Sequence, residues 1–503
     1  MSDEISLQQL LQRGFNSHRE GQFEAAIADY QAVLSAEPDN VDALRLTGAA
    51  FRALGDLNRA LAHYTRALRL APDNGDIWYN LGNALGDTGR REDALEAYQR
   101  AAELMPDKPA PLANIGVTLA ALGRADEAMA AYEKALALDP DHRIALHNLG
   151  NAHSDRGEME TAVRLLRRAT ALYPELAEAH YNLGLNLLRL QDYTQGFAEY
   201  EWRWQAKEFP SPPRHQTIPD WDGRPFAGKT LLIHAEQGLG DTIQFAKLLP
   251  LVKSLGGTVI FQAPDRLERL LNGIAGADRV TCRDPGPGEA DLQSPLLGLP
   301  HRLRLTLGSV PTGERWLYPA TQAVARWRER LGLEEGARAI GFVWRGNPLS
   351  PAEKGRSLDS AEALKPFAAL ENTRLIALQK LSEDEIELAE TPSGWKVKGL
   401  PFTLEYPGTD FDEGKDAFLD TAAIMACLSG VVSVCTAPLH LAGALGCPTV
   451  GLIKKVPDWR WGLSGETSPW YPSLTLIRQQ VAGDYAPAIA EAVVRMRAII
   501  DKR

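Results

Sequence analysis

The first two-fifths of the chain repeats itself with a fixed step of 34 residues. Four residue types keep this step independently of one another. The glycines are Gly14, Gly48, Gly82, Gly116, Gly150 and Gly184. The prolines are Pro38, Pro72, Pro106, Pro140 and Pro174, and the alanines are Ala26, Ala60, Ala94, Ala128 and Ala162. The tyrosines are Tyr30, Tyr64, Tyr98, Tyr132 and Tyr200, with Leu166 in the one substituted place. This period predicts stacked structural units, because one such unit does not bury its apolar face alone.

Each unit is expected to be a hairpin of two helices. The glycine and the alanine allow the two helices to approach closely, and the proline ends the second helix. The tyrosine is expected to fill the groove between neighbouring hairpins. Residues 85–107 show a short turn and then the 3.6-residue apolar period of a helix. These positions resemble the tetratricopeptide repeat. Over residues 7–205 the resemblance implies an all-α superhelix of about six hairpins with a concave groove. We expect its final aromatic cluster, Tyr200–Trp204, to dock the array onto the next domain.

An asparagine stands two positions before the repeat glycine in four successive units. These residues are Asn80, Asn114, Asn148 and Asn182, whereas the first two units carry Gln12 and Leu46. The position lies on the first helix of each hairpin, which lines the inside of such arrays. A side-chain amide donates to and accepts from a peptide backbone at once, so the ladder predicts binding of an extended polypeptide. The O-GlcNAc transferase superhelix is similar, with an Asn ladder at the same repeat position. The alternative is that these residues only cap or solvate a helix face.

A chain of 503 residues is too long for one core and predicts about three domains. Its formal charge of −11 argues against nucleic acid as a partner, because phosphate binding needs clustered Lys and Arg. The scattered cysteines and the absence of a signal-peptide pattern at the start predict a cytoplasmic protein. The uncharged run Gly430–Ile453 contains two prolines, so strand–helix–strand is favoured over an integral membrane segment.

After the repeats, residues 206–229 are expected to form a linker, since Lys207–Lys229 holds five prolines and no helical period. The pattern then alternates between strands and helices. An N-terminal lobe on the acceptor side is expected at 230–315, with strands Thr230–Ala235, Thr258–Ala263 and Asp278–Cys282 and a helix Thr242–Leu255. A C-terminal lobe on the nucleotide-sugar side is expected at 316–503, with strands Ala339–Trp344, Thr373–Gln379, Gly430–Cys435 and Pro448–Ile453 and helices Asp420–Leu428, from Leu439, and Ala486–Ile500. Two Rossmann-like lobes predict an α/β GT-B fold, in which ligands bind at the carboxyl ends of the strands.

Several ordered motifs in this second half resemble a glycosyltransferase family, the one that includes the lipopolysaccharide heptosyltransferases. They are GLGDTIQF (Gly238–Phe245), FVWRGNP (Phe342–Pro348), GRS (Gly355–Ser357) and VVSVCTAPLHLAGALGCPTVGL (Val431–Leu452). The segment Pro457–Pro472 looks like bacterial fusions of this domain to tetratricopeptide repeats. The resemblance covers about 250 residues and implies the GT-B fold and transfer from a nucleotide sugar.

Asp241 is the candidate catalytic base. An inverting transfer needs a base that deprotonates the acceptor hydroxyl, and a carboxylate after the first strand suits that role. The family places its proposed base at the Asp of a GD motif, which is Asp241 here. The alternative is that Asp241 only caps the following helix.

The donor diphosphate needs a site that stabilises its negative charge, and the turn Cys435–Pro438 before a helix offers one through Thr436 and Ala437. The other candidate donor-binding residues are Arg345, Asn347, Arg356, Gln379, Asp420, His440 and Lys454. The three cations suit phosphate. The family usually has His at the place of His440, which by itself is more often a packing residue. Gln379 resembles a residue that lines the donor pocket, and Asp420 would take ribose hydroxyls or, as we favour, cap its helix.

Cys435 departs from the family, which usually has Asp there and so forms an Asp-Thr pair on the donor sugar. A thiol does not accept hydrogen bonds as a carboxylate does, so either an altered sugar or a loss of activity follows. A nucleophilic role has no identifiable His partner, and a small buried residue is the simpler interpretation. No group of His, Asp and Glu has metal-ligand spacing, so we expect metal-independent chemistry and no cofactor beyond the nucleotide-sugar substrate.

The sequence therefore favours a protein O-glycosyltransferase that modifies Ser or Thr of a polypeptide held by the repeats. Flagellin-type proteins are one class of bacterial acceptor that fits, although nothing in the sequence singles them out. Two alternatives stay open: a transferase acting on a lipopolysaccharide-type acceptor, and a non-enzymatic protein-binding scaffold with a degenerate transferase domain.

Overall fold

The computed structural model describes residues 6–207, 209–334, 336–349, 353 and 355–502. The chain forms two compact units, which divide between Ala179 and His180. This boundary lies inside the helix α11 (Ala177–Arg189), so the sixth hairpin belongs to the second unit. The sequence pattern instead ended the array at residue 205, because periodicity reports how a hairpin is built and not which neighbour it packs against.

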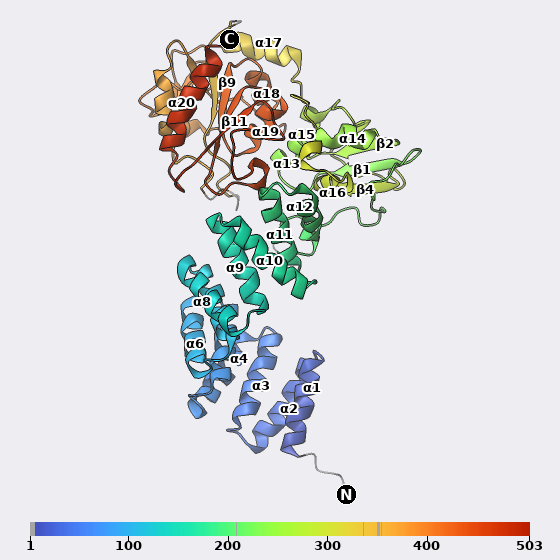
Figure 1. Ribbon diagram of the computed structural model, residues 1–503, viewed down its shortest axis with the longest axis vertical. Helices are drawn as coiled ribbons and strands as arrows, with labels where there is room; N and C mark the ends of the chain where they lie inside the picture. Colours follow the sequence, from blue (N-terminus) through green and yellow to red (C-terminus); the bar gives the residue numbers. More distant parts are fainter. Residues whose placement is uncertain (1–5, 208, 335, 350–352, 354, 503) are drawn as a thin grey trace. The chain divides into compact units, whose positions relative to one another are not determined.

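Within residues 6–179, ten helices pair as five hairpins. They are α1 (Leu7–Arg19), α2 (Phe23–Ala36), α3 (Val41–Ala53), α4 (Leu57–Leu70), α5 (Gly75–Asp87), α6 (Arg91–Leu104), α7 (Pro109–Ala121), α8 (Ala125–Leu138), α9 (Arg143–Arg156) and α10 (Met159–Leu172). Figure 1 shows these hairpins in blue and cyan. Each even-numbered helix ends two residues before a repeat proline, as expected. The short turn inside each hairpin holds a glycine with positive φ. These are Gly21, Gly55, Gly89, Gly123 and Gly157, again 34 residues apart.

The repeat glycine and the repeat tyrosine are partners within one hairpin. A Cβ atom added to Gly14, Gly48 or Gly82 would lie 2.6 Å from the tyrosine ring sixteen residues later. The expected close approach of the two helices is confirmed. The tyrosine was expected to fill the groove between neighbouring hairpins. The ring instead packs onto the glycine of its own hairpin. This pairing explains why glycine and tyrosine recur together, and why the smaller Leu166 faces Gly150.

The second unit begins with the sixth hairpin, α11 and α12 (Tyr193–Tyr200), followed by the 3-10 turn η1 (Glu201–Trp204). Its aromatic cluster docks onto the α/β region of the same unit, as predicted. Tyr193 accepts a hydrogen bond of 2.9 Å from Nε1 of Trp470. The hydroxyl of Tyr200 accepts one of 2.8 Å from the Gln237 amide. The last hairpin is therefore built into the α/β region.

The first α/β part of this unit contains a four-stranded parallel sheet in the order β3-β2-β1-β4. Its strands are β1 (Thr230–His234), β2 (Thr258–Gln262), β3 (Arg279–Thr281) and β4 (Leu292–Pro295). Its helices are α13 (Leu239–Phe245), η2 (Ala246–Leu248), α14 (Leu249–Lys253), α15 (Asp265–Leu271), η3 (Leu296–Gly298), α16 (Leu299–Arg302) and η4 (Leu307–Ser309). The helix expected at Thr242–Leu255 begins earlier and is broken, with Pro250 in its last piece. The sequence pattern missed β4.

The second α/β part contains a five-stranded parallel sheet in the order β11-β10-β9-β5-β6. Its strands are β5 (Ala339–Val343), β6 (Arg374–Ala377), β9 (Gly430–Val434), β10 (Thr449–Ile453) and β11 (Leu474–Arg478), with a separate hairpin β7 (Ile386–Leu388) and β8 (Trp395–Val397). Its helices are α17 (Thr321–Arg330), η6 (Ala361–Ala369), η7 (Glu383–Glu385), α18 (Leu419–Met425), α19 (Ala437–Ala444), η8 (Trp459–Trp461) and α20 (Ala486–Ile500). The closing helix α20, red in Figure 1, packs on β9, β10 and β11.

Gly430–Ile453 forms β9, α19 and β10, which confirms the strand–helix–strand interpretation of that uncharged run. None of the helices in the described residues combines the length and the apolar character that crossing a membrane requires. The two sheets with their helices confirm an α/β region after the repeats. One continuous core of buried apolar residues joins the last hairpin to both sheets.

Candidate functional site

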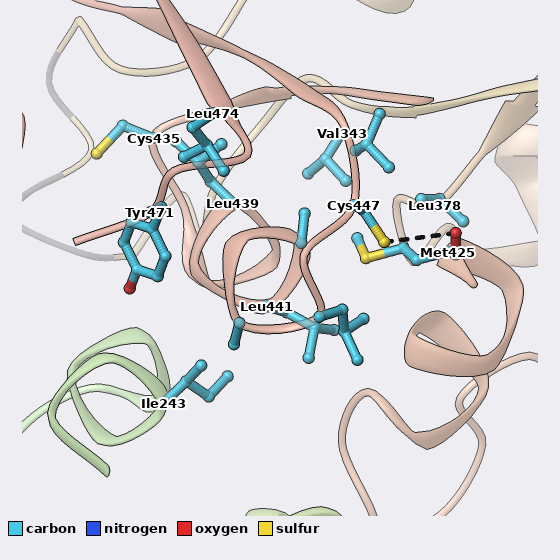
Figure 2. Packing of buried hydrophobic residues seen from close by; sticks show 14 of the residues in the cluster. Ile243, Val343, Leu378, Met425, Cys435, Leu439, Leu441, Cys447, Tyr471 and Leu474 are labelled. Carbon is cyan, nitrogen blue, oxygen red and sulfur yellow. Dashed lines mark hydrogen bonds between the residues drawn. The ribbon is translucent and has the colours of Figure 1, made fainter. Parts of the chain in front are cut away.

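The loops that follow β1 and β9 meet where the two sheets come together. A Cβ atom added to Gly240, in the first turn of α13, would lie 2.8 Å from Cδ2 of His440 on α19. Figure 2 shows Ile243 of α13 beside the face of α19 that carries Leu441, with Tyr471 nearby. The glycine thus lets the two helices touch, and the candidate residues Asp241 and His440 are brought together at the carboxyl ends of both central strands.

Asp241 lies in the first turn of α13 and is not the residue that precedes the helix. Its Oδ2 accepts a hydrogen bond of 2.9 Å from the backbone N–H of Gly238. Its Oδ1 pairs with the guanidinium of Arg460, whose Nη1 lies 2.8 Å from Oδ1 of Asp458. Burial raises the pKa of Asp241, and Arg460 opposes that rise. Asp241 therefore makes the contact expected of a helix cap, and its raised pKa also suits a group that accepts a proton.

His440 is buried beside the loop that carries this carboxylate. Its Nδ1 lies 2.7 Å from the hydroxyl of Tyr471. Burial, with Arg460 nearby, lowers the pKa of His440 to about 3. The imidazole is therefore neutral near pH 7 and hydrogen-bonds Tyr471, and its role at the donor site stays a prediction.

Cys435 follows β9 and lies beside the same cluster. The indole Nε1 of Trp461 donates to its sulfur over 2.7 Å. Burial raises the pKa of the thiol, so the group is a neutral thiol and not a thiolate. Where the resembling family carries a carboxylate, this chain thus has the small thiol of Cys435, which is hydrogen-bonded to Trp461.

Two of the predicted donor-binding cations lie near Cys435. Arg356 and Lys454 act on each other electrostatically, and burial together with Arg356 lowers the pKa of Lys454. The Nε atom of Arg356 is buried without a hydrogen-bond partner among the described residues. A Cβ atom added to Gly346 would lie 3.2 Å from the methyl group of Thr436, so the loop after β5 reaches the start of α19.

The other predicted residues of the β5 and β6 loops make contacts of their own. Arg345 pairs with Glu385 at 2.6 Å, and its backbone N–H donates to Gln379 at 3.2 Å. The side chain of Asn347 accepts the N–H of Leu349 at 3.0 Å. Arg345 and Gln379 are therefore neighbours, as the parallel order β5–β6 requires.

Asp420 is not brought to the Asp241 cluster by any contact of the described residues. Its carboxylate accepts hydrogen bonds from Nε1 of Trp327 at 2.6 Å and from the N–H of Asp412 at 3.1 Å. Arg326 pairs with it at 2.8 Å. The residue thus joins α18 to α17. The favoured prediction that Asp420 caps its own helix is wrong, because Asp412 Oδ1 accepts the N–H of Asp420 at 3.0 Å and no side chain of the N-terminal residue caps α18.

Residues 209–221, which we call the strap, lie at the carboxyl ends of β1 and β2 and pair in parallel with Gln293 near the start of β4. Ser211 donates to the carbonyl of Glu236, and Nε2 of His215 lies 2.8 Å from Oε1 of Gln262. The backbone of Gln293 exchanges hydrogen bonds with Trp221 and Pro219 at 2.8 and 2.9 Å. The Pro-rich linker therefore lies across the strand ends of the first sheet.

One group of described residues has metal-ligand atoms close together, within 4.8 Å: Asp265, Glu268 and Cys282. It lies at β3, two strands away from β1. Glu268 already accepts the N–H of Cys282 at 3.0 Å, and Asp265 pairs with Lys415 at 3.2 Å. The cluster around Asp241 is thus separate from it, and metal-independent chemistry stays a prediction.

The members of the Asn ladder are half-buried. Nδ2 of Asn114 donates to Oδ1 of Asn83 at 3.0 Å, and the same oxygen accepts the hydroxyl of Tyr98 at 2.9 Å. Nδ2 of Asn148 donates to the carbonyl of Ile144 at 2.9 Å. In the second unit, the carbonyl of Asn182 accepts Nδ2 of Asn186 at 2.8 Å. These contacts lie within the array itself, and a role in peptide binding stays a prediction.

Models of the repeat family match residues 48–89, described as "TPR repeat", and residues 73–141, 107–175 and 147–207, described as "Tetratricopeptide repeat". The first part of the chain is an array of tetratricopeptide repeats. Protein FlbA of Caulobacter vibrioides is 27% identical over 335 residues, covering 62% of this chain and 53% of that protein. The chain thus spans about half the length of this relative. Because 62% of 503 residues exceeds the repeats, the similarity extends beyond the tetratricopeptide array.

Solved structures are also similar to part of the chain. The crystal structure of MamA is 27% identical, with 33% of this chain and 96% of that chain covered and a TM-score of 0.30. YrrB, titled a TPR protein with an unusual peptide-binding site, is 25% identical, with 35% and 91% covered and a TM-score of 0.30. The thermophilic TPR protein TTC0263 of Thermus thermophilus is 22% identical, with 36% and 100% covered and a TM-score of 0.32.

Sequence reasoning missed Arg460, which pairs with Asp241 from more than two hundred residues away, and Asp458, which pairs with Arg460. Their segment was noted only for its resemblance to fusions with tetratricopeptide repeats. The alternation Asp458-Trp459-Arg460-Trp461 places both charges beside large apolar rings. Charges in such surroundings are usually paired, and this pattern was the available indication of a buried ion pair.

Proposed function

We propose that this chain is a protein O-glycosyltransferase with a GT-B domain. It transfers a sugar from a nucleotide sugar to Ser or Thr of a polypeptide bound by the repeats, with inversion and without a metal ion. One observation carries the proposal: the segment Pro457–Gly462 contacts both the last tetratricopeptide hairpin and Asp241. The carbonyl of Pro457 accepts Nε of Arg189, at the end of α11, at 3.3 Å. Three residues later, Arg460 pairs with Asp241.

The donor side is supported by the two parallel sheets and their loops. Ligands of such sheets bind at the carboxyl ends of the strands. Arg356 and Lys454 supply two cations at that place, and the positive end of the α19 dipole lies there as well, which suits a diphosphate. The resembling glycosyltransferase family places its donor at the matching motifs.

The strap favours a polypeptide over a lipopolysaccharide-type acceptor. It already occupies the strand ends of the first sheet, where a saccharide acceptor would otherwise have room. The last hairpin, by contrast, lies against the segment that holds Arg460. An acceptor that comes along a tetratricopeptide array is a polypeptide, since arrays of this kind present extended concave surfaces to protein partners.

The proposal is tested first by donor binding and then by transfer. Thermal unfolding of the full chain is followed with uridine-, guanosine-, adenosine- and thymidine-diphosphate sugars. A bound donor at a hundred times its Kd stabilises by about 2.7 kcal/mol. The donor that shifts the melting temperature is then incubated with a Ser- and Thr-containing peptide library, and intact mass is recorded. We expect a mass increment of one sugar that disappears in Asp241→Asn. No shift with any donor would contradict the proposal.

The polypeptide arm uses the Asn ladder. We expect Asn114→Ala with Asn148→Ala to weaken binding of the modified peptide at least tenfold, as two lost amide contacts would. The matched control is Asn58→Ala, which removes an exposed asparagine from the second helix of a hairpin. Equal weakening by Asn58→Ala, or none by the pair, would contradict the groove assignment.

A second candidate is a non-enzymatic protein-binding scaffold, and Cys435 is the observation that favours it. Its sulfur accepts the indole N–H of Trp461 where the resembling family has a carboxylate. A scaffold predicts partner binding that survives Asp241→Asn, no donor-induced shift in melting temperature and no mass increment.

A further inference from the structure

Arg460 lies between two carboxylates, and all three groups are largely buried. Its side chain is 8% exposed, against 19% for Asp241 and 29% for Asp458. Nη2 pairs with Asp241, Nη1 lies 2.8 Å from Oδ1 of Asp458, and the backbone N–H donates to the same Oδ1 at 3.1 Å. Asp458 therefore holds Arg460 twice, once through its side chain and once through its main chain.

The guanidinium is also held by aromatic rings. Its carbon lies 4.4 Å from the centroid of the Trp459 ring. That ring in turn lies 5.6 Å from the ring of Phe197 on the last tetratricopeptide hairpin. The planar fork of an arginine thus has a fixed orientation, and it presents one edge to Asp241 and the other to Asp458.

Charge balance distinguishes this arrangement from an ordinary ion pair. Asp458 stays ionised, because Arg460 lowers its pKa to about 2 in spite of burial. Asp241 is the carboxylate whose pKa burial raises. If Asp241 gains a proton, Arg460 keeps Asp458 as its counter-ion, so no buried charge loses its partner. Leaving a buried charge unpaired would be strongly unfavourable.

We propose that Arg460, held by Asp458, is a positioning residue that orients the Asp241 carboxylate for proton transfer and keeps the buried charges balanced when the proton arrives. This role rests on the proposed function. In the step it serves, the acceptor O–H proton moves to Asp241 and the acceptor oxygen bonds to the anomeric carbon. The bond from that carbon to the diphosphate oxygen breaks, and its electron pair leaves with the nucleoside diphosphate.

The charged and titratable groups around Asp241 come from four elements or loops. They are Arg356 after β5, Tyr471 before β11, His440 on α19, and Arg460 with Asp458 at η8. His440 is neutral near pH 7 and Tyr471 has a raised pKa. Arg460, Asp458 and Arg356 therefore set the local field, and changes to the first two have opposite expected effects.

The test is the pH dependence of kcat/KM for the full chain, with the donor and peptide found in the transfer assay. Arg460→Met removes the cation, so the acidic limb is expected to move to higher pH by about one unit. The rate should fall about a hundredfold, as for a misplaced base. In Asp458→Asn, Arg460 has Asp241 as its one remaining carboxylate partner in this cluster, which lowers the pKa of Asp241. The acidic limb of this variant is therefore expected to move to lower pH. Arg460→Lys keeps the charge and is expected to recover about tenfold or more of the loss.

Circular dichroism and the donor-induced shift in melting temperature are recorded for each variant, and Arg224→Met serves as a control that removes an exposed arginine. A purely structural role would lower the rate of both variants without moving the acidic limb to higher pH in Arg460→Met and to lower pH in Asp458→Asn. If Arg460→Met does not fold, the pH profiles of Arg460→Lys and Asp458→Asn still test the role of Arg460. Limbs that stay in place, or move together, would overturn the role of Arg460 while leaving transfer intact. A wild-type chain that transfers no sugar would overturn the proposed function, and the role of Arg460 with it.

Discussion

Arg203 and Glu236 form an ion pair that is almost completely removed from solvent. Nε of Arg203 lies 2.9 Å from Oε2 of Glu236, and Nη2 lies 3.1 Å from Oε1. The two side chains are 0% and 1% exposed. Oε1 also accepts the N–H of Leu297 at 2.8 Å. The pair joins the end of the last hairpin to the loop after β1, and Asp241 follows shortly after that loop.

Arg203→Met is expected to lower the free energy of unfolding by about 3–5 kcal/mol, because it leaves the Glu236 carboxylate buried without its counter-ion. Glu236→Gln should cost less, because Arg203 keeps Glu201 as a counter-ion at 2.6 Å. Arg203→Met with Glu236→Leu should recover most of the loss. Urea unfolding followed by tryptophan fluorescence measures this. Ten of the 11 tryptophans come after residue 179, so the method reports the second unit. A loss no larger than that of the exposed-site variant Arg224→Met would contradict the assignment.

Gly82 and Gly89 separate two reasons for a glycine that recurs in every repeat. A Cβ atom at Gly82 would lie 2.6 Å from Cδ1 and Cε1 of Tyr98, whereas one at Gly89 meets nothing within 4 Å. Gly89 instead has a φ of +79°. We expect Gly82→Ala to destabilise the first unit by about 1–3 kcal/mol through overpacking, and Gly89→Ala by about 1–2 kcal/mol through backbone strain. Adding Tyr98→Leu should reduce the cost of the first change alone. Thermal unfolding followed by circular dichroism measures both, and rescue of Gly89→Ala by Tyr98→Leu would contradict this distinction.

The repeats were predictable because each hairpin is determined locally. A glycine and the tyrosine sixteen residues later meet in the same hairpin, so one period of sequence contains the whole contact. The same holds for β9, α19 and β10, where an apolar run, Pro438 and a glycine-containing turn follow each other along the chain. Such features depend on neighbouring residues, which is why their positions were close to those observed.

The composition of the site was less predictable, because its contacts are long-range. Asp241 and Arg460 are 219 residues apart in the chain. Neither periodicity nor local motif indicates that they meet. The strap is a similar case. The five prolines of residues 207–229, four of them in the strap, predicted an irregular segment, but the hydrogen bonds of the strap to the first sheet depend on tertiary packing. Asp420 was ambiguous in sequence because an aspartate at a helix start suits both a cap and a ligand, and its partners Trp327 and Arg326 lie on another helix.

His234 and His440 predict a pH dependence of stability in the second unit. Burial lowers their pKa values to about 4 and about 3, below the value of about 6.5 for an unfolded histidine. As the pH falls from about 6.5 to about 5, the unfolded chain therefore binds a proton at each site that the folded chain does not, so stability decreases. Urea unfolding at about pH 7 and about pH 5 should show this loss. Replacing either histidine by glutamine should reduce it by about 2 kcal/mol. The same loss in wild type and in both variants would contradict the prediction.

Asp420 provides a test that separates a structural carboxylate from a donor-binding one. Its oxygens accept the N–H of Asp412 and the indole N–H of Trp327, and Arg326 pairs with it. Asp420→Asn turns part of this acceptor into a donor that faces other donors, so we expect a loss of about 1–3 kcal/mol in the free energy of unfolding. The affinity for the donor identified by thermal shift should change less than about twofold, because both oxygens serve contacts within the protein. A tenfold weaker affinity with unchanged stability would instead place Asp420 at the ribose. Arg356→Gln is the matched comparison, since Nε of Arg356 is buried without a hydrogen-bond partner in the described chain. That variant is expected to weaken donor binding with little loss of stability.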